Sequence, residues 1–486
     1  DASILWDAGQ LLADRAADAR TIYTAVREDA DLANPLVRTE FTVANEATLG
    51  PLIDDVQNDN AGLIEFIRGV GRDWKLGDIN RSTPVVVGPP SKDAALMGDS
   101  AADTSYADFK TTYANRSPVV FAGANDGMLH CFDVLTGEEL WAFIPYNLLP
   151  KLKEMYQFDA ADPSFHFFMP SQTGYVDATP AVADVQISGA WRTVLVCGQG
   201  PGSGSVLAGG LNYYWALDVT DPLNPQPLWE ITHTDSISGM RTMGETRSTP
   251  AIGKISVLGL PLWVAFMGSG YDNDTSSTIA GTYFYTVRID TGEIISALTV
   301  DADVDTSAFT GDKEPYRYTN IAPAIVAGPA AVDNDVDGYV EYVYVADLDG
   351  RVYRLDASVT AVSSWTLAPI YVDYLNYPIS TRPAVWLNPY ESTPTPPRVY
   401  FGTGGHDRNL GTYNPGTDEL AGRTFSFVGL IDGGPDQTPS KDWVEWYIGD
   451  PTLLGGLPTT KDTGDLGAGY KVWADPVLAD NIIYFS

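Results

Sequence analysis

The spacing of apolar residues changes near residue 80 and divides the chain into two parts. Before that point, apolar residues recur at helical spacing from Ile4 to Val26, which predicts one amphipathic helix. Residues 62–68 predict a second, shorter helix. Beyond Asp78, short apolar runs with a period of two predict strands, and Gly, Pro, Asn and Asp between them predict turns. We therefore expect a helical segment at residues 1–80 that packs on a mainly-β domain at residues 81–486.

Two signatures repeat along the β region. The first is a small or polar residue, then proline and two small apolar residues, and it occurs at residues 83–86, 179–182, 249–252, 322–325, 382–385 and 475–478. The second is an aromatic-rich strand that ends in an apolar residue and Asp, at residues 132–133, 217–218, 289–290, 355–356 and 431–432. Proline suits the start of a strand, because its missing N–H costs no ladder hydrogen bond there. Residues 126–133 and 349–356 align without a gap, and each begins with an Asp-Gly hairpin turn.

These repeats predict blades of four antiparallel strands, with Trp141 and Trp229 on fourth strands. Successive copies of the proline lie 60 to 96 residues apart, as in a β-propeller with long loop insertions. A β-sandwich is the alternative, but a sandwich does not repeat one signature five or six times. The sixth proline motif and a strand at residues 482–485 predict the start of a last blade. Either N-terminal strands complete this blade, or the sequence in hand is truncated.

Residues 333–341 have the spacing of a calcium-binding loop. The expected ligands are Asp333, Asp335, Asp337, the backbone carbonyl of Tyr339 and Glu341, at positions 1, 3, 5, 7 and 9. Gly338 at position 6 permits the sharp bend that such a loop needs. Position 12 holds Tyr344 in place of the usual Glu, so Glu341 is expected to close the site between two strands. An Asp-rich surface turn is the alternative, but it would leave four carboxylates to repel one another.

A second acidic segment is a weaker calcium candidate. Asp301, Asp303, Asp305, Ser307 and Asp312 fall at positions 1, 3, 5, 7 and 12. Thr306 stands where the glycine is needed, so a solvated loop is the better interpretation.

Charge and composition exclude several functions. The chain carries 63 acidic and 29 basic residues, a net charge of −34, which repels nucleic acid and anionic membranes. No apolar run reaches the roughly 18 residues that a membrane span requires. The two cysteines, Cys131 and Cys197, are either buried free thiols or one bridge between adjacent strands. Four widely spaced histidines form no zinc motif, and no nucleophile motif or carboxylate pair indicates an enzyme.

The order of these segments resembles the C-terminal region of the PilY/PilC-type proteins of bacterial type IV pili. The resemblance covers essentially the whole chain and rests on residues 5–12, 20–23, 67–69, 76–85, 120–130, 333–341 and 346–350. It implies a modified, about seven-bladed β-propeller that is extracellular, at the cell surface or pilus tip. It also implies that the protein acts with minor pilins in pilus biogenesis and takes part in attachment to surfaces or host cells.

The resemblance implies that calcium, the one expected cofactor, sets the balance between pilus extension and retraction. The ligands of the family map onto Asp333, Asp335, Asp337, Tyr339 and Glu341, with Glu at the last position where Asp is expected. The resemblance also implies a further N-terminal region, sometimes adhesive, that is not among these residues.

Two other functions stay open at this point. Residues 133–141 resemble the tryptophan-docking motif of quinoprotein dehydrogenases, but only one good copy occurs and no cysteines are adjacent. An extracellular binding propeller unrelated to pili is the third possibility.

Overall fold

The computed structural model describes most of the 486-residue chain. The described residues are 4–27, 35–53, 59–159, 162–167, 175–200, 212–234, 242–271, 281–300, 323–373, 377–387, 396–404, 425–435, 443–449, 472, 474–479 and 482–485. The chain forms two compact units. Unit 1 comprises Asp1–His233, Glu245–Thr249 and Ile289–Glu293, and unit 2 comprises Thr234–Gly244, Pro250–Arg288 and Ile294–Ser486.

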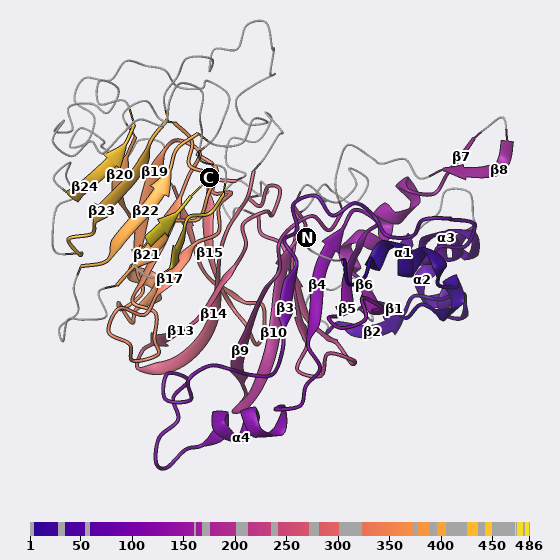
Figure 1. The fold of residues 1–486 in the computed structure, drawn as a ribbon, viewed down its shortest axis with the longest axis horizontal. Helices are drawn as coiled ribbons and strands as arrows, with labels where there is room; N and C mark the ends of the chain where they lie inside the picture. The colour runs from indigo at the N-terminus through magenta and orange to yellow at the C-terminus, as the bar shows by residue number, and fades with distance from the viewer. Residues whose placement is uncertain are drawn as a thin grey trace, which may run out of the picture. The chain divides into compact units, whose positions relative to one another are not determined.

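Unit 1 contains two large sheets (Figure 1). In the first, β3 (Val85–Val87), β4 (Val119–Ala124), β5 (Met128–Asp133) and β6 (Glu139–Ile144) form an antiparallel meander. In the second, β9 (Ala181–Ile187), β10 (Ala190–Gly198), β11 (Tyr214–Asp218) and β12 (Gln226–Ile231) do the same. A small hairpin of β7 (Gln157–Asp159) and β8 (Asp162–Phe167) lies between them in sequence.

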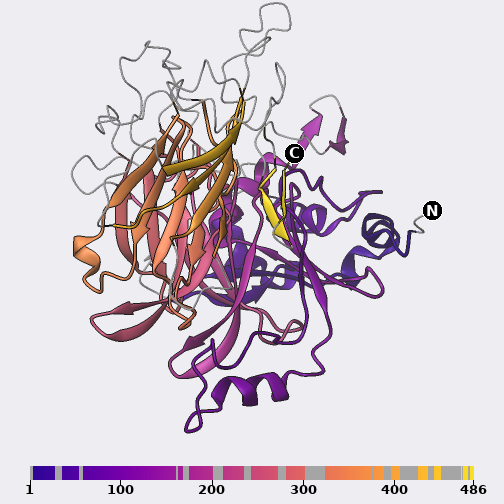
Figure 2. The same cartoon turned by 60° about the vertical axis from the view of Figure 1, so that its left-hand side comes forward.

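Unit 2 repeats the same four-stranded meander three times (Figure 2). The sheets are β13 (Ala251–Val257), β14 (Leu260–Gly268), β15 (Tyr283–Arg288) and β16 (Ile294–Thr299); β17 (Ala330–Val332), β18 (Tyr342–Ala346), β19 (Arg351–Asp356) and β20 (Leu367–Val372); and β21 (Ala384–Trp386), β22 (Arg398–Gly402), β23 (Phe427–Ile431) and β24 (Val444–Ile448). A hairpin of β25 (Val477–Ala479) and β26 (Ile482–Tyr484) follows. The mainly-β prediction is confirmed, and the number of blades stays a prediction.

Proline marks the start of a strand at five of the six repeats. Strands β3, β9, β13, β21 and β25 each begin at the residue after the motif's proline. Pro323 is the exception, because the first strand of its sheet begins only at Ala330. Both predicted Asp-Gly hairpins are confirmed, with Gly127 at φ +92° and Gly350 at φ +76°.

The N-terminal segment is only partly helical, so the prediction of one helix from Ile4 to Val26 was wrong. Helix α1 (Ala8–Asp14) begins where the Asp7 side chain accepts a hydrogen bond from the Gln10 N–H. It ends at Asp14, and the N–H of the next residue, Arg15, donates to the Leu12 carbonyl. Residues Ile22–Val26 form strand β1, which pairs in parallel with β6, and β2 (Val37–Glu40) pairs with β1. The first sheet therefore has six strands, two of them supplied by the N-terminal segment.

The other helices are short. They are α2 (Glu46–Ile53), α3 (Asn60–Arg68) and α4 (Ser105–Thr112), with 3-10 turns η1 (Ala17–Ala19), η2 (Val43–Asn45), η3 (Tyr146–Glu154) and η5 (Val362–Ser364). Helix α3 confirms the helix predicted at residues 62–68. The division of the chain into domains at residue 80 stays a prediction.

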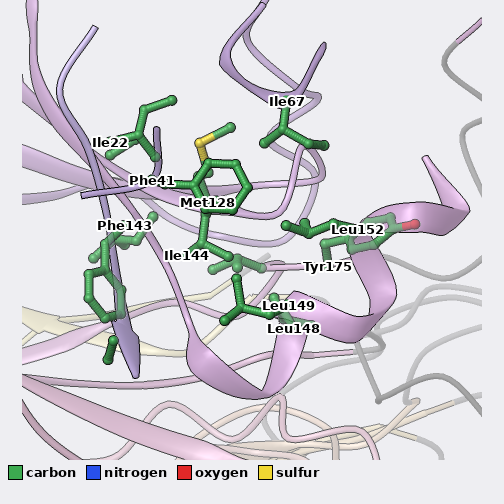
Figure 3. Close-up of a cluster of buried hydrophobic side chains, with 14 of the residues drawn as sticks. Ile22, Phe41, Ile67, Met128, Phe143, Ile144, Leu148, Leu149, Leu152 and Tyr175 are labelled. Atoms are coloured by element: carbon green, nitrogen blue, oxygen red, sulfur yellow. The ribbon is translucent and has the colours of Figure 1, made fainter. Parts of the chain in front are cut away.

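The core of unit 1 joins the N-terminal segment to the first sheet (Figure 3). Ile22 and Phe41 from the N-terminal segment and Ile67 from α3 pack with Met128 of β5 and Phe143 of β6, all almost fully buried. Burying such side chains contributes about 1.5–3 kcal/mol each. The N-terminal segment is thus an integral part of the hydrophobic core. Cys131 and Cys197 lie in this core as free thiols.

A buried ionic network ties the same elements together. His130 on β5 lies between two carboxylates, with Nδ1 2.8 Å from Glu139 Oε1 and Nε2 3.1 Å from Asp126 Oδ2. Arg20 donates to both oxygens of Glu139 at 2.9 Å, and Asp126 accepts from the Gly77 N–H at 2.8 Å. Since all four side chains are buried, the network fixes residues 20 and 77 against the β4–β6 meander.

Tryptophans dock on glycines of Thr-Gly turns in unit 1. The ring of Trp229 on β12 lies against Gly292, which has φ +75°, and its Nε1–H donates to the Ile289 carbonyl at 2.8 Å. Trp6 repeats this arrangement, because its ring lies against Gly137 at φ +74° and its Nε1–H donates to the Val134 carbonyl at 2.9 Å. Trp6 therefore supplies from the N-terminal segment the contact that Trp229 supplies from a fourth strand.

Candidate metal centre

The predicted calcium loop joins two strands of one sheet in unit 2. It occupies the connection between β17 and β18, where the Glu341 N–H donates to the Val332 carbonyl at 3.0 Å. Gly338 has φ +89°, a conformation that glycine adopts without strain. Val336 also has a positive φ, +63°, which is uncommon for a β-branched residue. The loop is a sharp strand-to-strand bend, as the sequence predicted.

The structure brings four of the five predicted ligand residues together. Asp333, Asp335, Asp337 and Glu341 each offer a carboxylate oxygen, and these oxygens lie within 4.8 Å of one another. Among the residues that the structure describes, no other group of three or more His, Cys, Asp or Glu side chains meets this condition. The fifth residue, Tyr339, lies in the same loop, and its role through the backbone carbonyl stays a prediction.

Backbone N–H groups of the loop orient the carboxylates. Asp333 accepts hydrogen bonds from the N–H groups of Asp337 at 3.0 Å and Gly338 at 2.8 Å. Asp337 in turn accepts from the Tyr339 N–H at 2.8 Å. Glu341 reaches back across the loop and accepts from the Asn334 N–H at 2.6 Å. The loop is therefore closed at position 9, where the sequence placed its final carboxylate.

Burial, with a contribution from neighbouring carboxylates, raises the proton affinity of two side chains of the loop. Partial burial, together with the charges of Asp335, Asp333 and Asp337, raises the pKa of Glu341 to about 7. Partial burial also raises the pKa of Asp333, although the N–H groups of Gly338 and Asp337 oppose the shift. A cation bound among these carboxylates would oppose both shifts, because a nearby positive charge favours the ionised form.

The loop is anchored on the neighbouring sheet of unit 2. The Val340 N–H donates to the carbonyl of Lys254, in the middle of β13, at 2.8 Å. The Lys254 ammonium lies 4.1 Å from the centre of the Tyr339 ring. A Cβ atom on Gly253 would stand 2.5 Å from Val340 Cγ2, so glycine permits this approach. Order in the loop is thus coupled to contact between two sheets.

The donor set fits a calcium ion. Calcium takes six to eight hard oxygen ligands, and the four clustered carboxylates alone offer up to eight. Asn334 Oδ1 adds a buried oxygen that has no hydrogen-bond partner among the described residues. Sulfur and imidazole ligands, which favour zinc, are not part of the cluster. The weaker candidate, Asp301 to Asp312, lies outside the described residues.

Sequence reasoning did not find the residues that support the loop. Lys254 and Gly253 lie about 80 residues before it, on a strand whose own pattern gives no sign of the contact. Asn334 is an ordinary loop residue by sequence. Only the proximity of β13 and the loop in the fold reveals these roles.

Fold and site together define a class: a mainly-β repeat protein of propeller-blade sheets with an acidic loop between two blade strands. The family model for the PilY1 beta-propeller domain matches residues 76–367. The chain therefore belongs to the PilY1 β-propeller family, which confirms the resemblance inferred from the sequence.

Two curated relatives are type IV pilus biogenesis factors. PilY1 of Pseudomonas aeruginosa (strain UCBPP-PA14) is 33% identical over 365 residues, which cover 72% of this chain and 28% of that protein. A PilY1 homolog of Xylella fastidiosa (strain Temecula1 / ATCC 700964) is 31% identical over 398 residues, covering 81% of this chain and 28% of the relative. The chain thus matches somewhat more than a quarter of each relative's length.

A solved structure supports the fold. The crystal structure of the Pseudomonas aeruginosa PilY1 C-terminal domain is similar with a TM-score of 0.54 and 23% sequence identity, covering 82% of each chain. Among the described residues, no helix has both the length and the apolar character to cross a lipid bilayer.

Proposed function

We propose that this chain is the calcium-binding propeller part of an extracellular type IV pilus biogenesis factor. It acts without catalysis at the cell surface or pilus tip, together with minor pilins. There it supports pilus assembly, regulates extension against retraction, and contributes to adhesion. The pilus role is supported by the relatives, which are type IV pilus biogenesis factors.

One observation carries the calcium part of the proposal. Four carboxylates from one nine-residue loop converge within 4.8 Å, and the loop closes on itself through Glu341 and Asn334. Asp333, Asp335, Asp337, the carbonyl of Tyr339 and Glu341 would hold the ion. Bound calcium would favour the ionised forms of Asp333 and Glu341, whose pKa is raised by partial burial and by the neighbouring carboxylates.

The position of the loop supports a regulatory role. Val340 and Tyr339 contact β13 of the neighbouring sheet, so ordering of the loop reaches beyond its own strands. Loss of the ion would release four like charges within one turn and loosen this inter-sheet contact. The loop therefore acts as a clip between two blades.

Binding of the ion can be measured directly. Isothermal titration of calcium into the wild-type chain should give one site with a Kd roughly micromolar to millimolar. Asp335→Ala should abolish this site, because it removes an exposed carboxylate whose oxygen belongs to the cluster. Glu138→Ala is the matched control, since it removes one exposed negative charge in unit 1. Equal binding by wild type and Asp335→Ala would overturn the site.

The biological role needs a second experiment in the native host. Replacing Asp335 with Ala in the full-length protein should change the number of surface pili when retraction is active and leave Glu138→Ala cells like wild type. If Asp335→Ala cells carry as many pili as wild type, both with and without active retraction, calcium binding plays no part in pilus regulation. Failure of the minor pilins to co-purify with the protein would favour a propeller unrelated to pili.

The dehydrogenase alternative has a specific observation behind it. Residues 133–141 carry the tryptophan-docking motif in the sequence. In the structure, Trp229 makes a contact of this kind with Gly292. This contact carries no chemistry of its own. A redox-active quinone absorption spectrum in the purified protein would support the enzyme, and its absence would remove it.

A further inference from the structure

Each four-stranded meander ends in an outer strand with one edge outside the meander. Such an edge presents a row of N–H and C=O groups that can recruit another strand. Proteins block this with a covering strand, with proline, or with charged side chains. The five outer strands in the described residues are β6, β12, β16, β20 and β24.

Four of these edges are protected against pairing with another strand. Strand β6 is covered by β1, which pairs with it through Ile22–Thr24. Strand β12 contains Pro227 and Glu230, β20 contains Pro369, and β24 contains Glu445. These devices are those expected on edges that must not pair with another chain.

Strand β16 has no covering strand, proline or charge. It has a β-bulge against β15, but β6, β12, β20 and β24 each have such a bulge against their own neighbour, so the bulge does not distinguish them. The sequence of β16, Ile-Ile-Ser-Ala-Leu-Thr at Ile294–Thr299, has neither a charge nor a proline. Within the described part of the chain, no strand pairs with its outer edge. Uncharged segments rich in β-branched and aliphatic residues are also those that pair most readily with added strands.

The fold holds β16 firmly in an extended form. On one side β15 pairs with it from Tyr283 to Val287. Ile295 and Leu298 pack against the core cluster that contains Phe284 and Trp365. An edge that is already ordered loses little conformational entropy when a strand is added.

The protein itself shows how such an edge is filled. At the corresponding edge of the first sheet, β1 lies parallel to β6, and Thr24 Oγ1 also donates to the Ile144 carbonyl at 2.8 Å. Strand β1 reads Ile-Tyr-Thr-Ala-Val and is uncharged and rich in β-formers. It is therefore a template for the chemistry of a strand that fits an outer blade edge.

We propose that the outer edge of β16 is a docking site for an extended, uncharged strand of another protein. Main-chain hydrogen bonds provide the binding, as in other cases of strand addition. Side chains like those of β1, β-branched or aromatic and without charge, fit the half-buried surface beside the edge.

A peptide with the sequence of residues 21–26, acetylated, amidated and carrying an uncharged fluorophore, is the probe. It contains no charged residue, so the protein's net charge of −34 does not affect its binding. Its fluorescence anisotropy should rise on titration with the wild-type chain. The same peptide with Pro in place of Thr24 should bind at least about tenfold more weakly, because proline removes a main-chain donor.

Two substitutions on β16 test the location. Ala297→Lys and Thr299→Lys each place a protective charge on the edge strand and should weaken peptide binding about tenfold or more. Ala297→Val is the matched control, because it keeps the edge uncharged and favours strand, and it should bind like wild type. Thermal unfolding of each variant shows whether the fold is retained. Thr299 is exposed, so its variant tests the edge even if Ala297→Lys fails to fold.

Several outcomes would overturn the proposal. Peptide binding that is absent in wild type, or equal in wild type and both lysine variants, would show that β16 is not the site. Equal binding of the proline-containing peptide would show that main-chain pairing is not involved. Self-association that the lysine variants abolish, without peptide binding, would assign the edge to a second copy of the chain.

Discussion

At the scale of single residues, His130 is the most constrained ionisable group of unit 1. Both of its ring nitrogens face carboxylates, so both must carry a proton for each contact to be a hydrogen bond. Burial alone would lower the pKa of His130, but the charges of Asp126 and Glu139 outweigh it and raise the pKa to about 9. The imidazolium is therefore the form that the folded chain stabilises at neutral pH.

The network makes stability depend on pH in a defined window. Because the folded pKa of His130, about 9, is above the unfolded one, its contribution is complete below the unfolded pKa and is lost as pH rises through 9. We expect wild type to lose on the order of 3 kcal/mol of unfolding free energy between roughly pH 6 and 10 through this group. Urea unfolding of wild type and His130→Asn at several pH values measures the difference, which should shrink as pH rises.

The control for this experiment is Leu135→Asn. It replaces an exposed apolar side chain and removes no titratable group, so it should keep the pH dependence of wild type. Identical pH dependence in wild type and His130→Asn would contradict the assignment. The measurements should be made above roughly pH 5. The pKa of Glu139 is lowered to about 2, so the contribution of Glu139 to the unfolding free energy is lost in acid.

The two residue clusters differ in how visible they are in the sequence. The five predicted ligands of the calcium loop occupy every second position from Asp333 to Glu341, so their spacing alone predicts the cluster. Arg20 and Glu139 are 119 residues apart, and no local pattern connects them. Local chemistry was predictable here, and partners distant in sequence were not.

At the scale of elements, strand β1 shows why a periodic pattern can mislead. Ile22, Tyr23 and Val26 continue the helical spacing of the residues before them, yet they form a strand. The pairing with β6, and burial against the core of unit 1, override the local preference. The β-branched and aromatic composition of Ile22–Val26 was the available signal.

The hairpin between β13 and β14 carries an unfavourable turn residue. Leu258 has φ +51° and is 78% exposed, and Gly259 follows at φ +83°. This turn type favours Asn before Gly, because Asn tolerates the left-handed conformation. We expect Leu258→Asn to raise the unfolding free energy by about 1 kcal/mol, measured by urea unfolding.

A second hairpin offers the matched comparison for Leu258→Asn. Ser188 occupies the same turn position between β9 and β10, also with φ +51°. Since Ser is already short and polar, Ser188→Asn should gain less than about half of that amount. A larger gain at Ser188, or a loss at Leu258, would show that other contacts determine the turn.

At the scale of the whole molecule, the charge of −34 opposes compactness. Salt screens this self-repulsion, since the Debye length falls from about 30 Å at 0.01 M to about 3 Å at 1 M. We expect NaCl over that range to raise the thermal midpoint by about 5 °C in the presence of a calcium chelator. Differential scanning calorimetry measures the shift, and a midpoint that falls or stays constant would contradict it. Asp335→Ala should show the same salt effect, which separates screening from calcium binding.

The parallel pairing of β1 with β6 also sets an order of events during synthesis. Thr24 and its partner Ile144 are 120 residues apart, and ribosomes add roughly 5–20 residues each second. Strand β1 therefore emerges on the order of ten seconds before the strand that pairs with it. Throughout that interval its apolar residues have no native partner in the sheet. During that interval the nascent chain exposes an uncharged strand-forming segment, which makes it vulnerable to pairing elsewhere.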